Sequence, residues 1–197
     1  MSGKVVLNMS ISLDGFIAGP NDDLVRLHDW IFTGGTDRTG GTSRSSAGDS
    51  KDAEVMNEMF RSTGAVILGR RTYDIGEPFW GPNPPFRVPC YVLTHRGREM
   101  QIRGETTFTF VTEGVESALR QARVAARHRN VSLMGARVAQ QFMKAELLDE
   151  IQLTLVPVLL REGIRLFENM GTKRVELERE RVIESSGVTH IKFRVVK

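Results

Sequence analysis

One junction between an expected strand and an expected helix organises this sequence: Val66-Ile67-Leu68-Gly69-Arg70-Arg71-Thr72-Tyr73. The apolar β-type residues stop at a glycine, and two arginines and a threonine open the helix. Backbone N–H groups at a helix N-terminus attract anions, and the threonine hydroxyl adds a donor. Gly69 lets the backbone pass close to a ligand, and one arginine can hold a phosphate in bidentate fashion. The run predicts either a phosphate site or an ordinary turn with two solvated arginines.

A second junction of the same kind occurs at Val131-Ser132-Leu133-Met134-Gly135-Ala136-Arg137-Val138-Ala139-Gln140-Gln141-Phe142-Met143. It again has a glycine between the expected strand and the expected helix, and an arginine just beyond that glycine. Two such junctions can bracket one dinucleotide, because each offers its own first-turn N–H groups to a phosphate.

The flanking sequence predicts strands joined by helices. Residues 4–12 read as a first strand that ends at the Asp14-Gly15 turn signal. Ser50 can cap a helix whose apolar residues recur at helical spacing. The segment 77–85 carries four prolines, from which we expect no regular structure. Further expected elements are a short helix after a strand at 65–69, a helix at 114–128, and strands at 89–94, 107–111 and 130–134.

The last third of the chain predicts strands joined by hairpins. Residues 150–156 and 190–195 alternate polar and apolar side chains, and the charged segment 174–184 predicts a solvated outer strand without a binding role. Strands joined by helices, followed by hairpins, describe a mixed sheet flanked by helices. The Gly/Ser/Thr-rich segment 33–50 is expected to be a flexible surface loop, and it lacks the spacing of a P-loop.

Composition limits the partners and the compartment. A chain of 197 residues with 40% hydrophobic and 26% charged residues predicts one globular domain over residues 1–197. The 27 basic residues are interleaved with 24 acidic ones, so no nucleic-acid partner is expected. Cys90 is the single cysteine, which excludes an internal disulfide, and the four scattered histidines predict no metal site. The N-terminal run is too short and too polar for a membrane span, so we expect a cytoplasmic protein.

Five blocks in this order make the chain resemble the dihydrofolate reductase-like superfamily. It is more closely similar to the reductase domain of the riboflavin biosynthesis deaminase/reductase proteins, as a stand-alone member. The resemblance implies an α/β, three-layer fold with a mixed, mostly parallel central sheet flanked by helices and a C-terminal antiparallel hairpin. The blocks are Ser10 to Ala18, Gly69-Arg70-Arg71-Thr72, Tyr91 to Arg96, Met134-Gly135-Ala136-Arg137, and Leu155 to Leu160 running on to Leu166-Phe167.

The same resemblance implies that the cofactor is NADPH. It implies backbone contacts to the nicotinamide from the first strand, phosphate contacts from both junctions, and adenosine contacts from Thr94-His95-Arg96. An extra basic group there favours a 2′-phosphate over a free hydroxyl. The residues implied to bind cofactor are Met9, Ser10, Gly69, Arg70, Arg71, Thr72, Thr94, His95, Arg96, Met134, Gly135, Ala136, Arg137 and Val138.

The chain departs from the family pattern at two places. Met134 stands where related reductase domains have a second glycine, and Arg161 and Glu162 stand where they have further glycines. We expect these departures to change the choice of substrate more than the binding of cofactor.

Reduction of a C=N or C=O bond needs a proton as well as a hydride. Asp14 is the candidate catalytic acid with the strongest motif, although an Asp-Gly turn explains it equally well, and Asp22, Asp23 and Asp29 are further candidates. Dihydrofolate reductases proper have a carboxylate on the helix that follows their first loop, and the resemblance does not extend to such a residue here, which argues against folate as the substrate. We expect Trp30, Trp80 and Pro157 to contact a flat substrate, although large aromatic residues are more often part of a core.

The resulting hypothesis is an NADPH-dependent reductase that acts on a flat heterocyclic, pyrimidine- or pterin-like substrate or on a carbonyl. It would be similar to 5-amino-6-(5-phosphoribosylamino)uracil reductase. The alternative is a non-catalytic NADPH- or nucleotide-binding sensor or interaction module. The expected partners are a small-molecule substrate and, by family resemblance, a second copy of the chain in a homodimer.

Overall fold

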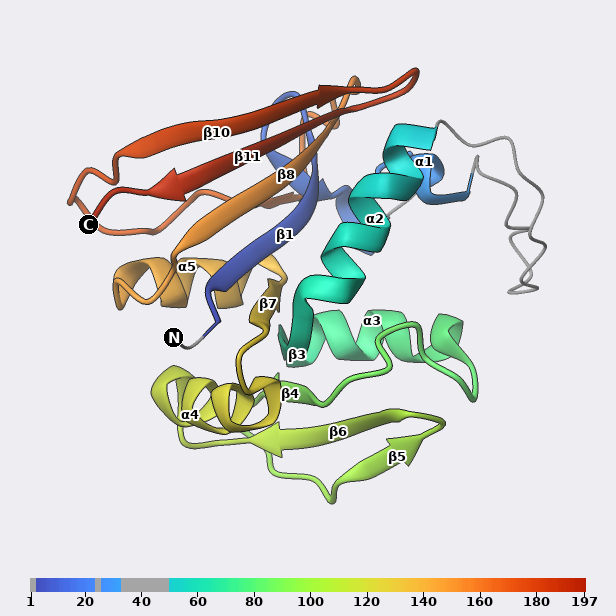
Figure 1. Ribbon diagram of the computed structural model, residues 1–197, viewed down its shortest axis with the longest axis vertical. Coiled ribbons are helices and arrows are strands. Elements are labelled where there is room, and N and C mark those ends of the chain that lie inside the picture. The colour runs from blue at the N-terminus through green and yellow to red at the C-terminus, as the bar shows by residue number, and fades with distance from the viewer. Residues whose placement is uncertain (1–2, 24–25, 33–49) are drawn as a thin grey trace.

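The computed structural model describes residues 3–23, 26–32 and 50–197 (Figure 1). In that part of the chain, nine strands form one sheet in the order β10-β11-β8-β1-β7-β3-β4-β6-β5. β2 and β9 form a second, two-stranded sheet. The strands are β1 (Val5–Ser12), β2 (Phe16–Ala18), β3 (Thr63–Gly69), β4 (Cys90–Leu93), β5 (Gln101–Arg103), β6 (Thr106–Val111), β7 (Asn130–Met134), β8 (Glu150–Val156), β9 (Ile164–Arg165), β10 (Leu177–Glu184) and β11 (Thr189–Val195).

The centre of the large sheet is parallel and its two edges are antiparallel. β1 pairs in parallel with β7 and β8, and β3 pairs in parallel with β7 and β4. The hairpin β10–β11 closes one edge, and β5 lies antiparallel to β6 at the other edge (Figure 1). The predicted mixed, mostly parallel sheet with a C-terminal hairpin is confirmed.

Helices lie on both faces of this sheet and make three layers. The helices are η1 (Pro20–Asp22), α1 (Asp29–Phe32), α2 (Ser50–Ser62), α3 (Arg70–Trp80), α4 (Val115–Ala126) and α5 (Ala136–Lys144). The larger core joins α4 and α5 to one face, through residues such as Leu119, Phe142 and Ile67. A second core joins Tyr73 of α3 to Leu68 on the opposite face. β3 is apolar on both sides because helices cover both faces of the sheet.

The proline-rich segment differs from our expectation at its start. α3 continues through Pro78 to Trp80, so the expectation of no regular structure over 77–85 was wrong for its first four residues. Proline removes its own N–H donor, and α3 ends two residues later at Trp80, before Gly81 with φ +58°. One missing bond in the last turn does not stop the helix. The predicted flexible loop at 33–50 lies almost wholly outside the described residues.

β1 and β7 part at the carboxyl end of the sheet. Their paired register runs from Val5↔Val131 to Leu7↔Leu133 and goes no further, whereas β1 stays paired with β8 up to Ser12↔Val156. In open parallel sheets, ligands bind beyond the carboxyl ends of the strands, where neighbouring connections diverge. The end of the β1–β7 pairing therefore lies at the edge where a ligand is expected.

Candidate functional site

The two strand-to-helix junctions lie in direct contact. Gly69 precedes α3 and Gly135 precedes α5, and β3 and β7 are paired neighbours in the sheet. A Cβ atom added to Gly135 would lie 2.4 Å from Oγ1 of Thr72, and one added to Gly69 would lie 3.4 Å from Cγ2 of Val138. Each junction therefore passes close to a side chain of the other. The pairing of the two sequence motifs is a feature of the fold.

Both helices present first-turn backbone N–H groups at this contact. Because glycine has no side chain, neither Gly69 nor Gly135 can cap the helix that follows it. Gly135 has φ +93°, a conformation that favours glycine, and its N–H points toward the Sδ atom of Met9 at 3.3 Å. Met9 of β1 thereby contacts the second junction. The donors of Ala136, Arg137 and Val138 follow in the first turn of α5, where an anion fits the positive end of the helix dipole.

The two arginines of the first junction are held by carboxylates of this chain. The Nε atom of Arg70 lies 2.7 Å and 2.9 Å from the two carboxylate oxygens of Asp74, one turn along α3. The Nη2 atom of Arg71 lies 2.6 Å from Oδ1 of Asp22, in the loop after β2. Both pairs are partly or largely exposed. Such pairs stabilise the fold little, so a phosphate can compete for these guanidinium groups at small cost.

The third predicted cofactor segment lies at the carboxyl end of β4, beside β3. The N–H of Thr94 donates to Val111, and its hydroxyl oxygen accepts the N–H of Arg96 at 3.1 Å. The side chains of His95 and Arg96 are exposed. The hydroxyl therefore holds a turn that leaves an imidazole and a guanidinium facing solvent. Their proposed contact with adenosine stays a prediction, as do the individual roles of the other cofactor residues.

Asp14 holds two distant loops together. Its carboxylate accepts the hydroxyl of Ser12 at 2.6 Å and the backbone N–H groups of Leu160 and Arg161 at 3.2 Å and 2.7 Å. The Ser12 hydroxyl, together with these N–H groups, lowers the pKa of Asp14 to about 2. An acid with this pKa is ionised at neutral pH and accepts hydrogen bonds. The catalytic role proposed for Asp14 stays a prediction, and the geometry gives this carboxylate a holding role as well.

Arg161, which stands where a glycine is expected from the family pattern, has a strained backbone conformation. Arg161 has φ +67°, a left-handed conformation that glycine adopts without cost. Its N–H donates to Asp14, and this charge-assisted bond offsets part of the backbone strain. Arg161 thus adopts in this chain a backbone conformation that favours glycine.

The predicted substrate residues lie in different surroundings. The indole N–H of Trp30 donates to Oγ of Ser10 at 3.0 Å, so this ring lies on β1. Trp80 stacks on Phe108 with ring centroids 5.6 Å apart and an interplanar angle of 3°, within the core beneath α3. Pro157 is exposed directly after β8. The structure brings Trp30 to β1 beside Ser10, and gives Trp80 a packing role in the core.

A group of polar residues that sequence reasoning did not select lies beside Ser10. His190 of β11 is 3% exposed, and its Nε2 atom lies 2.8 Å from Oδ1 of Asp52 on α2. Its Nδ1 atom lies 3.0 Å from Oγ1 of Thr154 on β8. In the sequence, the available signal was a polar residue at an inward-facing position of β1, β8 and β11, namely Ser10, Thr154 and His190. That signal becomes readable only when the strand register is known.

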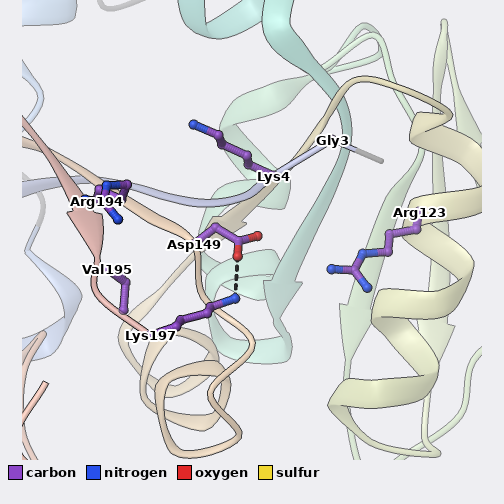
Figure 2. A pocket seen from close by; sticks show the side chains of 7 residues that line it. All are labelled: Gly3, Lys4, Arg123, Asp149, Arg194, Val195 and Lys197. Atoms are coloured by element: carbon purple, nitrogen blue, oxygen red, sulfur yellow. Dashed lines mark hydrogen bonds and ion pairs between the residues drawn. The ribbon is translucent and has the colours of Figure 1, made fainter. Parts of the chain in front are cut away.

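A separate pocket lies at the opposite end of the sheet. It measures about 450 Å³ and is basic (Figure 2). Three of its four basic side chains already pair with carboxylates: Lys4 with Glu150, Arg194 with Glu178, and Lys197 with Asp149. Arg123 of α4 is the fourth basic side chain. None of the predicted site residues lines this pocket, which lies beside the amino end of β1.

Over residues 3–23, 26–32 and 50–197, no group of three or more His, Cys, Asp or Glu side chains could hold a metal ion. Within the same ranges, every helix is too short or too polar to cross a bilayer.

Comparison with known proteins points to one family. Residues 3–191 match the family model described as RibD C-terminal domain. The uncharacterised protein YwjB of Bacillus subtilis (strain 168) is 28% identical over 173 residues, which cover 86% of each chain.

Two solved structures share the fold. One, from Shewanella sp. PV-4 and provisionally described as a riboflavin biosynthesis protein, has a TM-score of 0.75 at 20% identity, with all of both chains covered. The other is the Thermotoga maritima diaminohydroxyphosphoribosylaminopyrimidine deaminase/5-amino-6-(5-phosphoribosylamino)uracil reductase, with a TM-score of 0.67 at 17% identity. The match covers 99% of this chain and 57% of that longer protein. Both confirm the predicted dihydrofolate reductase-like architecture.

Proposed function

The chain belongs to the RibD C-terminal domain family, and from this premise we propose that it is an NADPH-dependent reductase. The proposed reaction transfers a hydride to a flat, pyrimidine- or pterin-like heterocycle or to a carbonyl compound. The observation that carries the proposal is the contact between the two junctions, where Gly135 lies against Thr72. Two helix N-termini and two arginines at one sheet edge fit the phosphates of a dinucleotide.

The donor set fits the cofactor group by group. Backbone N–H groups of residues 135–138 suit the pyrophosphate, and Thr72 adds a hydroxyl donor beside them. The guanidinium groups of Arg70 and Arg71 suit further phosphate charge, and His95 with Arg96 suits a 2′-phosphate. When bound, NADPH would supply the hydride. The residues of this chain would hold its phosphates and place a substrate along β1, where Ser10 and Trp30 already meet.

Equilibrium titration of NADPH fluorescence tests cofactor binding. We expect saturable binding that is weaker for NADH, because NADH lacks the 2′-phosphate that the basic residues would contact. Arg70→Gln and Arg71→Gln should each weaken binding roughly tenfold, since about 1.4 kcal/mol of binding free energy corresponds to that factor. Arg127→Gln, at an exposed position beyond α4, is the matched control and should change nothing. Absence of binding at millimolar NADPH contradicts the proposal.

Turnover separates an enzyme from the alternative sensor or interaction module. Oxidation of NADPH is followed with a panel of pyrimidines, pterins and small carbonyl compounds. Saturable oxidation with any of them excludes the sensor. Tight binding without oxidation across the panel excludes the reductase and leaves the sensor.

We also propose that the chain forms a homodimer through the hairpin β10–β11, in place of the expectation that the charged segment 174–184 has no binding role. β10 is an edge strand whose Leu177 and Val182 are 43% and 46% exposed. Edge strands with exposed apolar side chains favour pairing with another chain. Sedimentation equilibrium tests this, and a monomer at micromolar concentration refutes it.

A further inference from the structure

A chain of buried polar contacts links α2 to the sheet beside the proposed nicotinamide strand. Asp52 bonds to Nε2 of His190, and Nδ1 of His190 bonds to Oγ1 of Thr154. Thr154 is the direct neighbour of Ser10 in the β8–β1 register, and of His190 in the β8–β11 register. Ser10, Thr154 and His190 therefore share one face of the sheet, and we name them the polar floor. All three are less than a tenth exposed.

The polar floor already carries a flat heterocycle. The indole N–H of Trp30 donates to Ser10, and the indole edge meets the His190 ring with centroids 5.2 Å apart at 73°. This placement demonstrates that a planar ring with a polar N–H fits against the floor. α1, which carries Trp30, has only four residues and is a separate element from the sheet. A substrate ring in the same position would face the same hydroxyl and imidazole groups.

A buried carboxylate and imidazole are costly to retain for packing alone. Apolar side chains of similar size commonly replace such a pair with no loss of stability, whereas removal of one partner is strongly destabilising. Further charged groups lie along this face, on β10 and on α2: Lys192, Glu150, Arg194, Glu180 and Glu58. Lys51 of α2 donates to the backbone oxygen of Glu184 at 2.9 Å. Lys192 and Glu150 pair with each other at 2.9 Å, and Glu58 pairs with Arg181 of β10 at 2.7 Å. Asp52 is therefore the carboxylate that faces His190 among the described residues.

The direction in which the Thr154 hydroxyl donates depends on whether Nδ1 of His190 carries a proton. Asp52 requires a donor, so Nε2 of His190 carries a proton in either state of the ring. With neutral His190, Nδ1 accepts the Thr154 O–H, and the floor offers an acceptor oxygen. With the imidazolium, Nδ1–H donates to Oγ1, and the Thr154 O–H is released toward the floor as a donor. The direction of this hydroxyl thus follows the protonation of His190.

We propose that Asp52 and His190 are positioning residues that supply the proton of the reduction through the hydroxyl of Thr154. The inference rests on the proposed reductase function. As hydride adds to the carbon of a substrate C=N bond, the π electron pair moves to nitrogen, which takes the Thr154 hydroxyl proton. The Nδ1 proton of His190 moves to Oγ1 in the same step. His190 is left neutral, Asp52 stays ionised, and water restores the proton after the product leaves.

Kinetics with 6,7-dimethyl-7,8-dihydropterin, a ring with a reducible C=N bond, tests this role. We expect His190→Gln and Asp52→Asn to lower kcat roughly 100-fold or more, the usual effect of losing a general acid, and to change KM less than about threefold. Thr154→Val should match His190→Gln, whereas Thr154→Ser keeps the hydroxyl and should recover most of kcat. The pH profile of kcat should differ between the wild type and His190→Gln. The exposed His128→Gln is the matched control.

A second readout does not depend on turnover. In ¹⁵N-histidine NMR spectra, addition of the dihydropterin or of 5,6-diaminouracil should shift the His190 ring nitrogens and leave those of His128 unchanged. Unaltered His190 resonances with both probes overturn the inference, and so does a His190→Gln enzyme with wild-type kcat and pH profile. Titration of NADPH fluorescence in the same variants should give wild-type affinity. If the wild-type protein binds no NADPH, the proposed reductase function is rejected. The NMR experiment then tests separately whether a flat heterocycle binds at the polar floor.

Discussion

Substitution of Gly135 by alanine tests the contact between the two junctions. The added methyl group would meet Oγ1 of Thr72 at 2.4 Å, a distance that Cβ atoms do not adopt. It would also place a Cβ atom at φ +93° and ψ +145°, backbone angles that favour glycine and cost other residues about 1–3 kcal/mol. Overpacking of this kind costs about 1–3 kcal/mol more. We therefore expect Gly135→Ala to lower the free energy of unfolding by about 2–6 kcal/mol, as the sum of these two ranges.

Two further substitutions separate the cost of backbone strain at Gly135 from the cost of overpacking against Thr72. Gly171 has φ +86°, and an added Cβ would have no atom within 4 Å, so Gly171→Ala reports the backbone cost alone. Thr72→Ala removes the clashing oxygen and leaves the Thr72 Cβ at an acceptable 3.6 Å. The double variant Thr72→Ala/Gly135→Ala should therefore recover the overpacking part, about 1–3 kcal/mol, and keep the backbone part.

Urea unfolding of the four proteins and the wild type measures these energies, with the slope of the transition as a check on two-state behaviour. NADPH titration of the same set should give a different order: Gly171→Ala should bind as the wild type does, whereas Gly135→Ala and both variants without the Thr72 hydroxyl should bind more weakly, because they alter the groups proposed to hold the phosphates. Equal stability of Gly135→Ala with and without Thr72→Ala would show that the junctions do not touch, and would refute the reasoning.

Three further outcomes follow from the site and the core. The pKa of Asp14 is lowered to about 2 from an ordinary 3.8, so its carboxylate adds stability that is complete above pH 3.8 and is lost as pH falls through about 2. Thermal unfolding of Asp14→Asn should therefore depend less on pH between pH 4 and 2 than that of the wild type. Parallel curves for the two proteins would contradict this. Burial raises the pKa of the Cys90 thiol, so a disulfide reagent at pH 8 should label it only in urea, and rapid labelling of the native protein would argue against burial. Arg71→Gln breaks an exposed pair with Asp22 and should change the free energy of unfolding by less than about 1 kcal/mol in urea titrations, a larger loss indicating a structural role.

The sequence was sufficient for the junctions because their signals are local. A glycine after an apolar run, followed by polar residues at a helix start, identified both Gly69 and Gly135 without any long-range information. The family resemblance supplied their pairing, and the fold confirmed it through the β3–β7 register. The error at Pro78 was local too, because a proline in the last turn of a helix removes one hydrogen bond and leaves the rest intact.

The contacts that the sequence could not reveal are long-range. Asp52 and His190 are 138 residues apart, and each fits an ordinary local pattern, a first-turn acid and a polar residue in an alternating strand. Asp14 was recognised as a turn former, but the N–H group of Leu160 that it binds lies 146 residues further along the chain. Only the strand order, which brings β11, β8 and β1 together, places these groups within hydrogen-bond distance.

The central claim is that the two junctions together hold the phosphates of NADPH, and a crystal structure of the chain soaked with NADPH tests it most directly. The account predicts the pyrophosphate within hydrogen-bond distance of the backbone N–H groups of residues 135–138 and of the Thr72 hydroxyl, with the nicotinamide along β1 at Met9 and Ser10. Pyrophosphate density elsewhere on the molecule, or no bound NADPH at millimolar concentration, would contradict it.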